Sequence, residues 1–296
     1  MEIVASKNIL LEYFDLLIPK QKTETEKSLQ ATIENNNNKI KFSSDYLEFL
    51  EFFFLEKGNH YLDFFQTFVM NCFTENRIIS FTSVVTSLDE NEIIINCFNH
   101  NYNDYSFYIS KHLNQKIKNS LSTNACTLEN VQKPNQDWLV LSVLSGNVVD
   151  VDYSNFSNQR ELSDFIGLIP RLSKKIEQIE IIDSYFNTGN HNLVYENLKS
   201  SKSKVKCFTR ISTAENKALK RKLIKEYFGK RKTSVSFSSD TKITHERKIR
   251  IGNLVVEFTH DLAEIKPQNK NWTIYLKVCD LKTQLFKENT NKYNAR

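Results

Sequence analysis

Residues 176–182 read Ile176-Glu177-Gln178-Ile179-Glu180-Ile181-Ile182, and residues 204–209 read Lys204-Val205-Lys206-Cys207-Phe208-Thr209. Both runs are rich in β-branched and aromatic side chains, a composition typical of strands. Sequences of helical character follow them at residues 192–199 and 214–230, and further strand-like runs lie at residues 234–237, 245–251, 254–259 and 272–278. Alternating strands and helices predict an α/β layer with parallel strands in this half of the chain.

The net charge of +5 is unevenly distributed. Residues 1–170 carry 13 basic and 22 acidic side chains, a net of −9, whereas residues 171–296 carry 27 and 13, a net of +14. A boundary between two domains is therefore expected around residues 167–170, with an acidic domain before it and a basic domain after it. The basic domain should attract polyanions.

The acidic half shows a different pattern. Helical spacing of apolar residues predicts helices within residues 7–18 and 44–72, with an exposed loop between them at residues 21–42. Two hairpins are expected, one from residues 77–85 and 92–98 and the other from residues 138–144 and 148–152. The sequence therefore predicts an α+β domain with an antiparallel sheet.

Several protein classes are disfavoured by the sequence. It starts without the features of a secretory signal and contains no apolar run of 18 residues. Its five cysteines are odd in number and never form a CxxC pair, which favours reduced, buried thiols over disulfides or a zinc site. We expect a cytoplasmic protein with no metal and no cofactor.

The predicted helix at residues 214–230 is strongly basic. Residues 199–232 hold 13 basic and two acidic side chains. One side of the helix should be apolar, formed by Ala218, Leu219, Leu223, Tyr227 and Phe228, and the rest should carry Lys217, Lys220, Arg221 and Lys225. This excess of charge predicts a phosphate-bearing partner, either nucleic acid or an anionic lipid headgroup.

A second basic stretch reads His245-Glu246-Arg247-Lys248-Ile249-Arg250-Ile251. On a strand, His245, Arg247 and Ile249 would share one face, so an imidazole and a guanidinium could converge on one phosphate. A histidine can attack phosphorus or transfer a proton, and an arginine can hold phosphate oxygens by paired hydrogen bonds. We therefore regard His245 and Arg247 as candidate catalytic residues.

The ordered series of residues 179–185, Asn192-Leu193, Lys204-Val205-Lys206 and residues 237–250 resembles the C-terminal phospholipase D-like domain of MIT-domain proteins, over roughly residues 175–285. The resemblance implies a phospholipase D-like α/β layer that binds phosphoinositides and membranes without demonstrated hydrolysis. Asp183 and Tyr185 stand at the family's D-P-Y positions, and His245 and Arg247 at its H-D-R positions. The family's G-R-G-L-D stretch appears here as Thr259-His260-Asp261-Leu262-Ala263, without the glycines or the final aspartate.

The wider phospholipase D superfamily pairs two histidines from two H-x-K half-sites, and this chain contains one comparable half-site. The resemblance therefore implies a homodimer if the protein hydrolyses its ligand. The phosphate-binding residues expected from the helix, the strand and the resemblance are Lys217, Lys220, Arg221, Lys225, Lys248, Arg250, Asp183, Tyr185, Thr259, His260 and Asp261.

These patterns leave several functions open. The leading hypothesis is a protein that recognises phosphodiesters and binds or cleaves nucleic acid, with a partner protein contacted through residues 1–170. The alternative is a membrane-associated adaptor that binds anionic headgroups without catalysis. Further alternatives are a structural subunit with a vestigial pocket, and a metal-dependent nuclease that uses the E-x-K triplet of Glu246 and Lys248.

Overall fold

The computed structural model describes residues 1–83, 89–100, 106–121, 125–146, 148–172, 178–184, 186, 193–199, 203–211, 215–228, 233–238, 247–259 and 273–279. The chain divides into two compact units, Met1–Asn147 and Val148–Arg296. The division lies ahead of the boundary expected around residues 167–170, because strand β6 (Val149–Asp152) already pairs with β12 (Thr273–Val278) of the second unit.

The first unit contains a five-stranded sheet in the order β3-β2-β1-β4-β5. Its strands are β1 (Glu2–Ala5), β2 (Lys39–Ser43), β3 (Ile78–Phe81), β4 (Ser106–Ser110) and β5 (Ala125–Thr127). Every neighbouring pair is parallel, so the expected antiparallel sheet is wrong. Parallel neighbours require crossover connections, which helices supply here.

Helices connect these strands and follow the last one: α1 (Lys7–Leu17), α2 (Glu24–Glu34), α3 (Ser44–Lys57), α4 (Asn59–Thr74), α5 (Glu90–Asn99), α6 (Gln115–Leu121), a short 3-10 turn (Leu128–Asn130) and α7 (Gln136–Ser145). Both expected hairpins are wrong, because residues 92–98 lie in α5 and residues 138–144 lie in α7. The N-caps Asp89 and Asn135 accept backbone hydrogen bonds that start these two helices.

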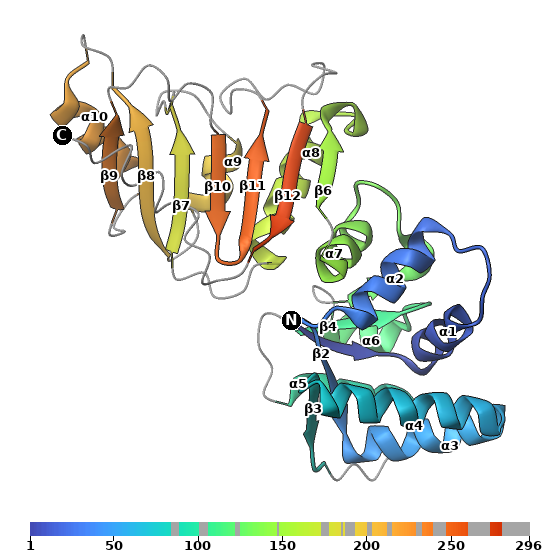
Figure 1. Ribbon diagram of the computed structural model, residues 1–296. Coiled ribbons are helices and arrows are strands. Elements are labelled where there is room, and N and C mark those ends of the chain that lie inside the picture. Colours follow the sequence, from blue (N-terminus) through green and yellow to red (C-terminus); the bar gives the residue numbers. More distant parts are fainter. Residues whose placement is uncertain are drawn as a thin grey trace. The chain divides into compact units, whose positions relative to one another are not determined.

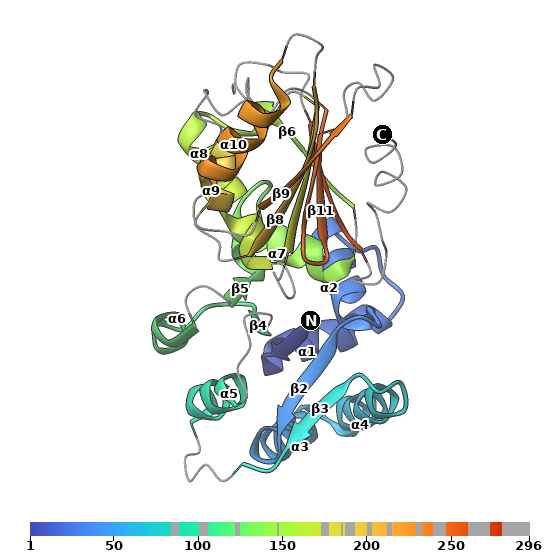
Figure 2. The same cartoon turned by 90° about the vertical axis from the view of Figure 1, so that its left-hand side faces the viewer.

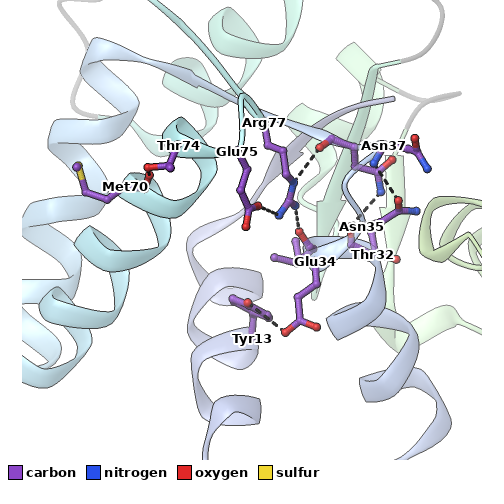
Figure 3. A network of polar contacts seen from close by, with 11 residues as sticks. Tyr13, Thr32, Glu34, Asn35, Asn37, Met70, Thr74, Glu75 and Arg77 are labelled. Carbon is purple, nitrogen blue, oxygen red and sulfur yellow. Dashed lines mark hydrogen bonds and ion pairs between the residues drawn. The ribbon is translucent and has the colours of Figure 1, made fainter.

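The segment expected to be an exposed loop, residues 21–42, instead forms α2 and most of β2. A network of polar contacts surrounds the connection between these two elements (Figure 3). Arg77 is 6% exposed and donates hydrogen bonds to the carbonyl oxygens of Ile33 and Asn38 and to Glu75. Asn38 Nδ2 donates to the carbonyl oxygens of Thr32 and Leu144, at 3.0 and 2.7 Å. These side chains pair carbonyl groups that the last turns of α2 and α7 leave open.

The second unit contains a seven-stranded sheet in the order β6-β12-β11-β10-β7-β8-β9 (Figure 1). Its other strands are β7 (Gln178–Asp183), β8 (Lys204–Arg210), β9 (Thr233–Ser238), β10 (Arg247–Ile251) and β11 (Leu254–Phe258). The parallel arrangement expected for this half holds for β7, β8 and β9. From β10 to β6 the neighbouring strands are antiparallel, so the sheet is mixed.

Three helices of the second unit, α8 (Gln159–Leu168), α9 (Leu193–Lys199) and α10 (Lys217–Tyr227), lie on one side of this sheet (Figure 2). Two 3-10 turns, Tyr153–Asn155 and Ile169–Leu172, flank α8. In the described part of the chain, no helix has both the length and the apolar composition required to cross a membrane.

We expect Arg77→Met to lower the free energy of unfolding by about 2–4 kcal/mol, because it leaves the carbonyl groups of Ile33 in α2 and of Asn38 just before β2 without this donor. Urea denaturation measures the change. The matched control is Lys27→Met, which removes an ion pair with Glu24 from an exposed part of α2 and should change stability by less than about 0.5 kcal/mol. Equal effects of the two substitutions would contradict the role given to Arg77.

Candidate functional site

The centre of the candidate site lies where the start of β10 meets the end of β7. Arg247, the first residue of β10, is the register partner of Asp183, the last residue of β7. Both are buried, with 6% and 2% of their surface exposed. Their side chains lie on the same face of the sheet as Ile249 and Ile181, in agreement with the alternation predicted for Arg247 and Ile249.

The neighbouring strands extend this pair into a row across the sheet. Ile182 pairs with Phe208 on β8, so Thr209 lies beside Asp183 on the same face. Thr209 in turn pairs with Phe237 on the edge strand β9. The row Arg247, Asp183, Thr209 and Phe237 therefore crosses four strands, a span of about 14 Å.

Tyr195 of α9 fixes the row to the helices above it. Its hydroxyl donates a hydrogen bond to Asp183 Oδ2 at 2.5 Å. The Tyr195 ring packs against Phe186, Tyr227 and Phe228, with ring centroids 4.6, 6.5 and 6.3 Å away. This aromatic cluster joins the end of β7 to α9 and α10, so the position of Asp183 depends on both helices.

Thr209 is a member of the row that sequence analysis missed. Its side chain is fully buried, and its Oγ1 has no hydrogen-bond partner among the described residues. A buried hydroxyl without a partner costs free energy, so the position is unusual for a threonine. The local sequence around a single threonine in a strand does not indicate a functional role. The neighbours of Thr209 can be identified only once the register of β7, β8 and β9 is known.

Helix α10 extends the row at its β9 end. The Lys217 Nζ and the Arg221 guanidinium lie over the Phe237 ring, 5.8 and 5.3 Å from its centroid. Lys220 is held by the Arg210 carbonyl and by Glu215, each at 2.9 Å, whereas Lys225 is exposed. Lys217 and Arg221 therefore lie together over Phe237, Lys220 has structural partners, and phosphate binding by these residues stays a prediction.

The apolar side predicted for α10 differs in the structure. Leu219 and Leu223 are 54% and 42% exposed, so they are not core residues. Ile224 is the buried residue of the helix, and Phe228 is buried directly after it. The outer surface of α10 consequently combines basic residues with two exposed leucines.

Lys248 and Arg250 do not join Arg247, which corrects the expected grouping. Strand alternation directs them to the opposite face, where Lys248 pairs with Glu257 at 3.5 Å and Arg250 with Glu180 at 3.9 Å. Lys206 also lies 3.9 Å from Glu180. Burial raises the pKa of Glu180, and the two nearby cations oppose that rise. These basic groups are thus engaged with carboxylates on the face opposite the row.

Of the remaining predicted residues, the structure describes Thr259. Thr259 follows β11, where its Oγ1 donates to the Thr273 carbonyl and accepts from the Thr273 N–H, so it closes the β11–β12 pairing. His245, Tyr185, His260, Asp261 and Glu246 lie outside the described residues. Within the described ranges, no group of three or more His, Cys, Asp or Glu side chains could hold a metal ion.

We expect Thr209→Val to raise the free energy of unfolding by about 1 kcal/mol, because it removes a buried hydroxyl without a described partner while keeping the side-chain shape. The matched control is Thr32→Val, since Thr32 is also fully buried but its Oγ1 donates to the Leu141 carbonyl at 3.3 Å. This control should lose about 1 kcal/mol. If urea denaturation shows that Thr209→Val is the more destabilising change, the interpretation of Thr209 is wrong.

No protein-family model matches the sequence, and no curated protein matches it. The solved structures that show a distant likeness include the following three. NucT from Helicobacter pylori is 17% identical, with 50% of this chain and 92% of that chain covered and a TM-score of 0.33. TrmBL2, described as an archaeal chromatin protein with a novel mode of DNA binding, is 17% identical, with 49% and 51% covered and a TM-score of 0.28.

The third structure is polyphosphate kinase from Porphyromonas gingivalis, which is 11% identical and has a TM-score of 0.30. The match covers 44% of this chain and 23% of the kinase, so this chain spans about a quarter of that protein. The resemblance to the MIT-domain family stays a prediction from the residues that carry it.

Proposed function

We propose that the second unit recognises phosphodiesters and that its ligand is nucleic acid. The observation that carries the proposal is the row that begins at the buried Arg247 and ends beneath the basic residues Lys217 and Arg221 of α10. A guanidinium is the side chain best suited to paired hydrogen bonds with phosphate oxygens. A basic helix near it would raise the local concentration of a polyanion.

The residues of the row would have different roles. Arg247 would bind a phosphate oxygen, whereas the Asp183 carboxylate would orient its neighbours, because two anions repel each other. The exposed cations of α10 would meet the ligand first, since Arg247 is nearly buried. His245 precedes Arg247 by two residues and would attack phosphorus if the protein cleaves its ligand.

A second candidate ligand, an anionic membrane surface, is favoured by the exposed Leu219 and Leu223. A basic helix with exposed apolar side chains is suited to the boundary between headgroups and acyl chains. Two leucines bury little area in a membrane, so this candidate ranks below nucleic acid.

We expect the double variant K217E/R221E to bind a single-stranded oligonucleotide at least about tenfold more weakly, with a salt dependence reduced by about two charges. Fluorescence anisotropy at several salt concentrations measures both quantities. The matched control is Lys118→Glu, which reverses an exposed charge on α6 in the first unit and should leave binding unchanged.

Two outcomes would contradict the nucleic-acid proposal. One is a loss of binding free energy in Lys118→Glu that is about half the loss in K217E/R221E, which would mean that binding follows net charge alone, because the double variant reverses two charges and the control reverses one. The other is the absence of oligonucleotide binding together with pelleting on vesicles that contain phosphatidylserine, which would support the membrane candidate.

If the protein cleaves nucleic acid, we expect cleavage in EDTA to be lost in His245→Ala while oligonucleotide affinity stays within about twofold of the unmodified chain. Gel analysis of a labelled oligonucleotide measures the cleavage, and anisotropy measures the affinity. The histidine mechanism also requires a second copy of His245, so cleavage should depend on dimer concentration. Undiminished cleavage by His245→Ala would exclude this mechanism and leave the binding proposal intact.

A further inference from the structure

Helices α3 and α4 form an antiparallel hairpin in the first unit, and Figure 1 shows them side by side. Gly58 joins them with a φ of 130°, a conformation that suits glycine. One side of the hairpin is buried, through Tyr46, Leu50 and Phe54 of α3 and Phe65, Phe68 and Cys72 of α4. Rings of this side pack on the rest of the unit, with the Phe14 and Phe54 centroids 5.2 Å apart.

Other side chains of the same hairpin are apolar and exposed. Phe52 and Leu55 of α3 are 63% and 51% exposed, and Met70 and Phe73 of α4 are 62% and 68% exposed. They are four of the ten exposed large apolar side chains in the described part of the chain. Single exposed apolar residues are ordinary, but a concentration of them on two packed helices is typical of an interaction surface.

The spacing of these residues suits a helical ligand. Phe52 and Leu55 are three residues apart, as are Met70 and Phe73, so each pair lies on one side of its helix. The half-buried Leu62 and Val69 of α4 belong to the same surface. From Leu62 to Phe73 the α4 axis extends about 16 Å, the length of three helical turns.

The charges of the hairpin restrict the partner. Residues 44–74 contain five acidic side chains, Asp45, Glu48, Glu51, Glu56 and Asp63, and one basic side chain, Lys57. Glu48, Glu51 and Glu56 are exposed on α3, and Asp63 is exposed on α4. The exposed apolar residues are therefore flanked by carboxylates, which attract a cationic partner and disfavour an anionic one.

We propose that the exposed side of the α3–α4 hairpin, formed by Phe52, Leu55, Met70 and Phe73, binds a basic amphipathic helix of a partner protein. The apolar stripe of that helix would lie across the hairpin, as in other complexes in which a helix docks into a groove. Its lysines or arginines would face the carboxylates of α3. The same side of a second copy is disfavoured, because two acidic surfaces would meet.

The test uses the full chain and a synthetic helical peptide of about 18 residues, with leucines at positions i, i+3, i+4 and i+7 and lysines elsewhere. We expect binding by isothermal titration calorimetry, with affinity at least about tenfold lower for the double variant F52Q/M70Q. The matched control is L17Q/I18Q, which changes two exposed apolar residues at the C-terminal end of α1 and should bind normally. Circular dichroism verifies that each variant is folded.

A second pair of variants tests the charge. E48K/E51K should lower the affinity for the same peptide at least about tenfold, whereas Glu24→Lys on α2 should change the affinity little. Equal binding of a scrambled peptide with the same composition would overturn the proposal. So would self-association of the chain in sedimentation equilibrium that F52Q/M70Q abolishes, because the occupant would then be a second copy.

Discussion

The register between β7 and β10 is the constraint on which the candidate site depends. These two strands join the parallel part of the second sheet to its antiparallel part. Side chains alternate between the faces, so a shift of one residue would move Arg247 to the charged face and bring Lys248 and Arg250 under the helices. Ile249 and Ile251 of β10 are buried on the same face as Arg247, and they oppose this shift because it would move both of them off that face.

How much of the fold the sequence reveals depends on the length and composition of each element. The strands predicted at residues 176–182 and 204–209 correspond to β7 and β8. Their β-branched composition and the helical sequences that follow them both indicate an α/β arrangement. Residues 92–98 and 138–144 were misread as strands, since a short apolar run fits a buried helix equally well. The caps Asp89 and Asn135, and Gly146 in the left-handed conformation, were the local signals that distinguish them.

The sequence predicts only the part of the site that follows from the alternation of side chains along one strand. Alternation along one strand placed Arg247 and Ile249 on one face, and the same rule separates Lys248 and Arg250 from them. The placement of Thr209 beside Asp183 requires the register of three strands with long connections, which no local pattern encodes. Similarly, the asparagines of residues 35–38 suggested a loop, although Asn38 holds the ends of two helices.

The net charge of each half says little about where a polyanion would be attracted. Residues 1–147 carry 12 basic and 18 acidic side chains, a net of −6, and residues 148–296 carry 28 and 17, a net of +11. On the sheet of the second unit, Lys206 and Arg250 share Glu180 and Lys248 lies near Glu257, so two carboxylates offset part of the charge of these three cations. The cations of α10 include exposed side chains at Lys217, Arg221 and Lys225. The attraction of this unit for polyanions should therefore originate mainly at the exposed cations of α10.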